Sequence, residues 1–242
     1  MSWHLGALTG VDFETTGVDP QTDRIVSAAV VTCGEVRRDV TATTWLADPG
    51  IEIPAGAAAV HGITTEQARR NGRPAAAVVS EVVAALATAV TAGMPIVAMN
   101  AAFDLTMLER EAERYGLAGL FGQVTPYVID PMVLDRQLDK YKPGRRTLTD
   151  LCRVYGVPLN GAHAADADAI AACKVARRIG SRYTQVGESE PRELHELQTG
   201  WARELAEDRA AYFRRTPGKE HLADGVRGEW PLVPAPREGG DA

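Results

Sequence analysis

The chain has 242 residues, of which 45% are hydrophobic, so it can bury a core of ordinary size. Its formal net charge of −6 argues against a protein that binds nucleic acid along an extended basic face, although bound cations can reverse the sign of a local acidic cleft. The sequence has no apolar run long enough for a membrane span, no basic-then-apolar N-terminal segment, and only three scattered cysteines. We therefore expect a cytoplasmic protein with no membrane association and no disulfide framework.

Three strands are predicted at the start of the chain. These segments, rich in Val, Ile, Thr and Trp, are Leu5–Phe13, Arg24–Thr32 and Val36–Leu46. The last two are separated by Cys33-Gly34-Glu35, which is typical of a hairpin turn. A loop containing VHGIT (residues 60–64) follows, and Thr64 or Thr65 is expected to cap the next helix.

Helices alternate with short strands in the rest of the chain. The segments with apolar residues at helical spacing are Pro74–Ala92, Ala101–Tyr115, Thr147–Tyr155, Ala164–Ser181 and Pro191–Phe213. Ile96–Met99 and Tyr127–Asp130 are predicted as short buried strands, and Pro131 is suited to open a further helix. This order predicts an α/β fold with a mixed five-stranded sheet flanked by helices. We expect residues 1–182 to form the main domain and residues 183–242 a C-terminal helix with a Pro/Gly-rich tail.

Four carboxylates occur where predicted strands end or helices begin. Asp12 and Glu14 point to the same side of the first strand, because side chains alternate along a strand. Asp104, in NAAFD (residues 100–104), and Asp168, in HAADADA (residues 163–169), each lie early in a helix. Each aspartate alone is explained by the favourable helix dipole. Their shared location is more informative, since ligand crevices of α/β sheets form at such points.

Clustered carboxylates suggest a metal site. Four oxygen donors without a Cys/His cluster favour Mg²⁺ or Mn²⁺ over zinc, and their charge is sufficient for two ions. Two such ions ~3.5–4 Å apart can activate a water and stabilise the leaving oxygen of a phosphoryl displacement. His163 lies five residues before Asp168 and is suited to act as a general base, although a lone histidine is more often a surface or capping residue.

Four motifs together resemble a known family. VDFETTG (residues 11–17), VHGIT, NAAFD and HAADADA, in this order, resemble the DEDDh, or DnaQ-like, 3′–5′ exonucleases, which include the proofreading subunit of the bacterial replicative polymerase. The resemblance runs from about Leu8 to Ser181. It implies a ribonuclease H-like fold and a two-metal-ion hydrolysis that releases nucleoside 5′-monophosphates from DNA 3′ ends.

The resemblance also implies roles for individual residues. Asp12, Glu14, Asp104 and Asp168 would be the catalytic metal ligands, and His163 the general base. Because the family pattern His-x-Ala-x-x-Asp is met by His163, Ala165 and Asp168, Asp166 is the less suitable ligand. The residues expected to bind the terminal nucleotide are Thr15, Thr16, Val60, His61, Asn100 and Phe103. Asp130 matches a recurring aspartate of the family, to which we assign a structural role.

Two rival functions stay open at this stage. One is an RNA-directed exoribonuclease of the same family, similar to oligoribonuclease, because nothing in the sequence reports on a contact with the ribose 2′-OH. The other is a non-catalytic module that binds 3′ ends or a polymerase partner. The apolar stripe of the last helix, which includes Trp201, is expected to pack on the same chain; a polymerase or repair partner, or self-association, is the alternative.

A basic loop can be interpreted in two ways. Lys140, Lys142, Arg145 and Arg146 surround Pro143 and Gly144. A solvated loop is the default interpretation of such a cluster. The functional interpretation is a contact with the phosphate backbone upstream of the scissile bond.

Overall fold

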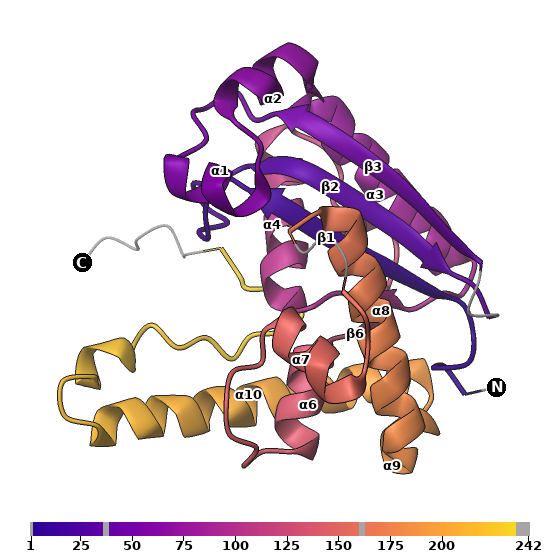
Figure 1. Ribbon diagram of the computed structural model, residues 1–242, viewed down its shortest axis with the longest axis vertical. Coiled ribbons are helices and arrows are strands. Elements are labelled where there is room, and N and C mark those ends of the chain that lie inside the picture. The colour runs from indigo at the N-terminus through magenta and orange to yellow at the C-terminus, as the bar shows by residue number, and fades with distance from the viewer. Residues whose placement is uncertain (1, 36–38, 160–162, 236–242) are drawn as a thin grey trace.

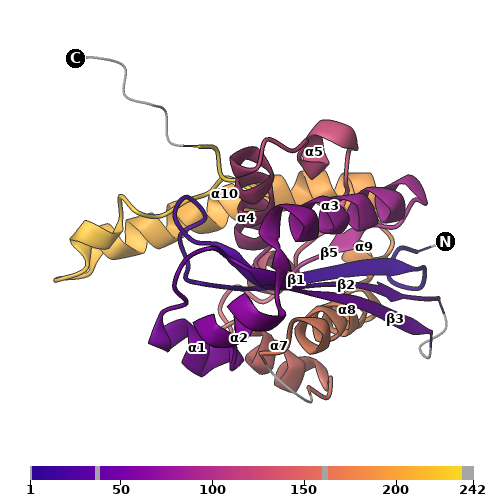
Figure 2. The ribbon, with the colours of Figure 1, turned by 90° about the horizontal axis from the view of Figure 1, so that it is seen from above.

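The protein folds into a mixed β-sheet with helices on both faces (Figures 1 and 2). The computed structural model describes residues 2–35, 39–159 and 163–235. The strands are β1 (Leu8–Thr15), β2 (Ile25–Cys33), β3 (Val40–Asp48), β4 (Arg73–Pro74), β5 (Ile96–Val97) and β6 (Val128–Ile129). Their spatial order is β4-β3-β2-β1-β5-β6. The α/β class and the ribonuclease H-like sheet predicted from the sequence are therefore confirmed.

Strand pairing divides the sheet into two parts. Antiparallel pairing joins β1 to β2 and β2 to β3, whereas β5 and β6 continue the sheet in parallel from β1. The hairpin between β2 and β3 closes through a hydrogen bond from the Gly34 amide to the Asp39 carbonyl, and residues 36–38 lie outside the described part. A sixth strand, β4, adds two residues beside β3 to the five that were predicted. It was not predicted because Arg73–Pro74 is too short to show a pattern.

The helices match the sequence prediction closely, with additions. They are α1 (Ala55–His61), α2 (Thr65–Asn71), α3 (Ala75–Thr91), α4 (Ala101–Arg114), α5 (Leu120–Gln123), α6 (Pro131–Leu138), α7 (Leu148–Tyr155), α8 (Ala165–Arg182), α9 (Thr184–Gly187), α10 (Pro191–Arg215) and the 3₁₀ turn η1 (Glu220–Leu222). Thr64, with Gln67, forms the capping box of α2. The stretch predicted as a loop around VHGIT contains α1, whose side chains show no buried stripe. Within the described ranges, no helix is both long and apolar enough to cross a bilayer.

The two faces of β1 pack against different helices. Val11 and Phe13 join the core under α3 and α4, and Leu8 joins the core under α8 (Figure 2). Gly10 faces α8 at a close approach: a Cβ atom there would lie 2.7 Å from the Cys173 sulfur and 2.8 Å from a backbone oxygen of α8. The absence of a side chain at Gly10 thus sets the distance between β1 and α8. The three cysteines are buried and free.

The C-terminal region packs on the rest of the chain rather than standing apart. Helix α10 lies against β6 and α6, and the segment after it turns back along α10 (Figure 1). Trp201 contributes to both main cores, as predicted for its stripe. Leu197 and Tyr212, two other apolar residues of α10, do not share this packing and are 40% and 50% exposed. Trp230, in the returning segment, is buried in the core under α4.

Candidate active site

Three carboxylates converge where β1 ends. Asp12 and Glu14 come from β1 and Asp168 from the first turn of α8, and one oxygen of each lies within 4.8 Å of those of the other two. The side-chain alternation of β1 turns both of its acids toward α8. The close approach at Gly10 then brings Asp168 next to them.

The fourth predicted acid lies beside this group. Asp104 is in the first turn of α4, is only 5% exposed, and does not belong to the mutual 4.8 Å set. Its charge nevertheless raises the pKa of Asp12, and the charge of Glu14 raises that of Asp104. Asp104 therefore lies near the other acids and adds its charge to the site from α4.

Burial and mutual repulsion disfavour the ionised forms of these acids. Burial is the largest cause of the raised pKa of Asp12, and the charges of Asp104 and Asp168 add to it. The pKa of Glu14 and that of Asp168 are raised first by burial as well. One oxygen of Asp168, Oδ1, is buried and accepts no hydrogen bond from the described residues. Clustered carboxylates with unfavourable charge and one unpaired buried oxygen fit a divalent cation such as Mg²⁺ or Mn²⁺.

His163 lies at the edge of this acidic site. Its backbone amide donates to Asp168 Oδ2 at 3.2 Å, and its imidazole is close enough to lower the pKa of both Glu14 and Asp168. Its side chain is exposed. The imidazole can therefore reach a solvent molecule beside the carboxylates.

Backbone strain marks both helix entries of the site. In the described part of the chain, His163 (φ 67°) and Asn100 (φ 64°) are the non-glycine residues with a left-handed backbone. His163 lies just before α8, which carries Asp168, and Asn100 is the N-cap of α4, which carries Asp104. Such conformations cost of order 1–3 kcal/mol and cluster at functional sites. Asn100 is exposed, which leaves its side chain free for a ligand.

The threonine hydroxyls of the turn after β1 form hydrogen bonds within the turn. Thr16 is buried; its hydroxyl donates to Asp23 at 2.8 Å and accepts from the Arg24 amide at 3.0 Å. The Thr15 hydroxyl donates to the Gly17 carbonyl at 2.6 Å. Both hydroxyls therefore stabilise the turn. A nucleotide contact predicted for these threonines would have to use backbone groups or a rearranged Thr15 rotamer.

The remaining predicted nucleotide contacts differ in their exposure and in their neighbours. His61 lies against the Thr15 carbonyl, and burial lowers the pKa of its imidazole, which favours the neutral form. Its Nδ1 accepts from the Ile63 amide, and its buried Nε2 has no partner among the described residues. Val60, one residue earlier on α1, is 53% exposed. Phe103 is partly buried against the core under α3 and α4.

The RNase_T sequence family, described as "Exonuclease", matches residues 9–176. This chain belongs to that exonuclease family. The match spans all four motifs and ends within α8, so the predicted relationship to the DEDDh, DnaQ-like exonucleases is confirmed at the family level. The closer likeness to a polymerase proofreading subunit stays a prediction. No curated protein matched the chain in the sequence comparison.

Solved structures share the fold at low sequence identity. E. coli exonuclease I in complex with a dT13 oligonucleotide is 21% identical with a TM-score of 0.62, and the match covers 75% of this chain and 42% of that chain. Exonuclease I from Methylocaldum szegediense, described as moderately thermophilic, is 19% identical with a TM-score of 0.62, and the match covers 86% of this chain and 46% of that chain. The match therefore spans less than half of these proteins. At this identity the likeness establishes the fold.

Within this exonuclease fold, Asp130 holds the start of α4 in place. Its buried carboxylate accepts hydrogen bonds from the amides of Asn100 (3.1 Å) and Ala101 (2.9 Å) and from the indole of Trp230 (3.3 Å). Gln198, on α10, accepts from the Asp130 amide at 2.8 Å. The structural role assigned to Asp130 is therefore visible in its contacts. Gln198 and Trp230 were missed because they lie outside the motifs.

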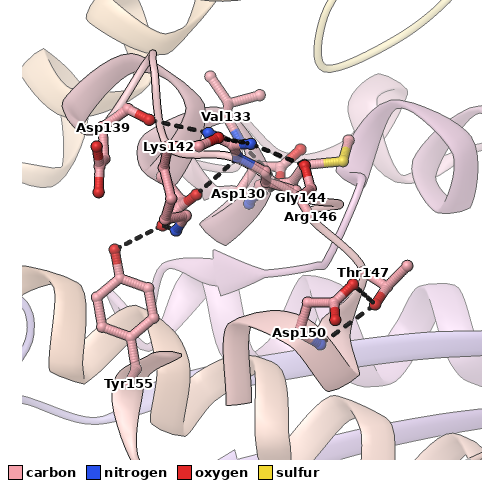
Figure 3. A network of polar contacts seen from close by, with 11 residues as sticks. Asp130, Val133, Asp139, Lys142, Gly144, Arg146, Thr147, Asp150 and Tyr155 are labelled. Atoms are coloured by element: carbon pink, nitrogen blue, oxygen red, sulfur yellow. Dashed lines mark hydrogen bonds and ion pairs between the residues drawn. The ribbon is translucent and has the colours of Figure 1, made fainter. Parts of the chain in front are cut away.

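Three of the four cations of the basic loop form ion pairs with carboxylates of the same chain. Lys142 (2.5 Å) and Arg146 (3.1 Å) pair with the buried carboxylate of Asp135, which also accepts from the Tyr155 hydroxyl at 2.7 Å. Figure 3 shows Lys142, Arg146 and Tyr155 brought together from the loop and α7. Because their charged groups are turned inward, the phosphate contact considered for Lys142 and Arg146 is not supported. Lys140, from the same loop, pairs with Asp208 of α10.

Proposed function

We propose that this protein is a metal-dependent 3′–5′ exonuclease that releases nucleoside 5′-monophosphates from DNA 3′ ends. The observation that carries the proposal is the convergence of Asp12, Glu14 and Asp168, with Asp104 alongside, inside a chain of the exonuclease family. In the reaction, water adds to phosphorus and the bond to the 3′ oxygen breaks. The products are a nucleoside 5′-monophosphate and a strand with a new 3′-OH.

The four acids would hold the metal. The buried Asp168 Oδ1, which has no partner among the described residues, and the mutual repulsion of the carboxylates support the binding of two divalent ions, Mg²⁺ or Mn²⁺. Such ions, when bound, neutralise the phosphodiester and lower the pKa of water. The chain itself contributes the placement of the carboxylates, because β1 is a strand of the sheet and α4 and α8 pack against it.

His163 is proposed as the general base. Its imidazole lies next to Glu14 and Asp168 and is open to solvent, so it can accept the proton that water loses as it adds to phosphorus. A base of this kind contributes roughly 10²–10⁴-fold to the rate. Asn100, Phe103, Val60 and His61 are proposed to hold the terminal nucleotide against the turn after β1.

An end-labelled single-stranded DNA assay tests the proposal. The wild type should shorten the strand from its 3′ end with Mg²⁺ or Mn²⁺ and release 5′-monophosphates, whereas Asp12→Asn should lose this activity. His163→Asn should lose about 10²–10⁴-fold in kcat, since asparagine tolerates the left-handed backbone but cannot act as the base. Asp166→Asn, also in the first turn of α8, is the matched control and should stay active.

Three outcomes would overturn this assignment. Full activity of Asp12→Asn and His163→Asn would show that the chemistry lies elsewhere. Hydrolysis of a matched RNA oligomer, with little on DNA, would point to an exoribonuclease instead. Tight binding of 3′ ends without product, with any divalent ion, would indicate a binding module.

Finer assignments are part of the same proposal. We propose residues 1–182 as the exonuclease domain and residues 183–242 as an appendage whose described part is packed on it. The location of the protein in the cytoplasm stays a prediction. The binding of a polymerase, a repair protein or a second copy of the chain at α10 is also a prediction. The exposed Leu197 and Tyr212 are the apolar side chains of α10 on which such contacts would depend.

A further inference from the structure

A groove between α6 and α10 has a charge opposite to that of the whole protein. Two adjoining cavities, of about 840 and 560 Å³, share the same central residues, among them Asn100, Arg136 and Arg209. The residues lining the larger cavity include five basic side chains and one acidic one. In a chain of net charge −6, this is a local concentration of positive charge.

Arg136 is the clearest sign that the groove is built for a ligand. It comes from α6 and is partly buried, and its Nε is buried without a hydrogen-bond acceptor among the described residues. Burial lowers the pKa of its guanidinium, and the charges of Arg209 and Arg146 lower it further. An anion would stabilise this partly buried guanidinium, because its Nε has no acceptor among the described residues and the charge of Arg209 acts on it.

The acids near Arg136 are already occupied. Asp135 pairs with the two inward-facing cations of the loop, and Asp130 accepts several backbone N–H groups. Asp208, the acidic residue that lines the larger cavity, pairs with Lys140. In the described part of the chain, neither Arg136 nor Arg209 has a carboxylate within 4 Å; Arg209 instead lies over the Phe213 ring, 5.3 Å from its centroid.

The groove reaches the residues that lead into α4, the helix that carries one of the proposed metal ligands. Met99 and Asn100 line the larger cavity and lead into α4, whose first turn carries Asp104. At the α10 side the cavities are lined by Tyr212, which is 50% exposed, and by Phe213. Guanidinium groups interleaved with aromatic rings are the surface that single-stranded nucleic acids bind, through phosphates and stacked bases. Helix α10 lies beyond the family match, which ends at residue 176.

We propose that the groove between α6 and α10 binds the phosphate backbone of the single strand upstream of the 3′ nucleotide, with Arg136 and Arg209 on the phosphates. This inference rests on the proposed function, because the strand enters the groove from the active site. It makes α10 part of the substrate-binding surface of this protein. It also explains how an acidic protein attracts a polyanion: the contact is confined to one groove.

Two substrates separate this inference from the proposed function. The p-nitrophenyl ester of thymidine 5′-monophosphate has no upstream nucleotide, whereas dT12 extends along the groove. Arg136→Gln and Arg209→Gln should each raise KM for dT12 about tenfold, because each removes a charge-assisted contact, and leave kcat/KM for the ester unchanged. Each substitution should also reduce the steepness of the plot of log(kcat/KM) for dT12 against log salt concentration, lowering its slope by about 0.7.

A second variant and a matched control separate a loss of DNA binding from a loss of folding. Arg209 is exposed, so its substitution leaves the core intact even if Arg136→Gln lowers the melting temperature. Arg192→Gln changes an exposed arginine on the same helix, roughly 25 Å away along its axis, and should behave as wild type. Unchanged KM and salt slope in Arg209→Gln, with the ester still hydrolysed, would overturn the inference. If the wild type hydrolysed neither the ester nor dT12, the proposed function itself would be refuted.

Discussion

Asp12→Asn should stabilise the metal-free protein while it removes activity. The substitution keeps the size of the side chain and removes one of the charges that lie within 4.8 Å of one another. At that separation and an effective dielectric constant of ~20, two unit charges repel by roughly 3.5 kcal/mol. Because the raised pKa of Asp12 lets a proton relieve part of this repulsion, we expect the free energy of unfolding to rise by about 1–3 kcal/mol at pH 8.

The gain from Asp12→Asn should depend on pH with a definite sign. The pKa of Asp12 is higher in the folded chain than its ordinary value of 3.8. As the pH rises above that value, the unfolded chain loses its proton first, so the folded wild type loses stability relative to it until the pH exceeds the folded pKa. The advantage of the variant is therefore absent below about pH 4 and grows toward neutral pH.

Thermal unfolding in EDTA and in Mg²⁺ measures both effects. For a chain of this size, each kcal/mol shifts Tm by roughly 2–4 °C. In EDTA, Asp12→Asn should melt above the wild type. Added Mg²⁺ or Mn²⁺ should stabilise the wild type by binding the folded state, and should stabilise the variant less.

A charge change outside the site provides the control. Glu207→Gln removes an exposed carboxylate from α10 and should leave both Tm and its response to Mg²⁺ unchanged. The reasoning would be refuted if Asp12→Asn melted below the wild type in EDTA. It would also be refuted if both proteins gained equally from the divalent ion, because the stabilisation would then come from another site.

Three further substitutions test the packing around the site. Gly10→Ala should cost about 1–3 kcal/mol and lower activity, because its methyl group would press on Cys173 and push α8 away; unchanged urea unfolding and kcat would contradict this. Gln198→Ala should cost about 1–3 kcal/mol, because it leaves the buried Asp130 amide without an acceptor, and a wild-type urea midpoint would count against it. Asp135→Asn should cost about 3–5 kcal/mol, because two inward-facing cations lose their buried partner; circular dichroism on heating measures it, and a loss below about 1 kcal/mol would show that water replaces the carboxylate.

Local features of the structure follow from contiguous residues. Strand alternation places Asp12 and Glu14 on one side of β1. Thr64 caps α2, Pro131 begins α6, and Thr147 caps α7 immediately before its first residue, at or within one residue of the predicted positions. These features depend on interactions within one turn or one strand, which a short stretch of sequence contains completely. The four motifs likewise identify the family without any knowledge of the fold.

Contacts between distant segments were decided by the tertiary structure. The Tyr155 hydroxyl reaches Asp135 across 20 positions, and nothing near Arg136 in the sequence indicates that its Nε has no acceptor among the described residues. Likewise, the support of Asp130 by Gln198 and Trp230 joins residues at least 68 positions apart. The sequence by itself determined which acids could meet and on which elements they lie. How closely they meet, and which cations stay free for a ligand, depend on packing between elements, and no local pattern records that packing.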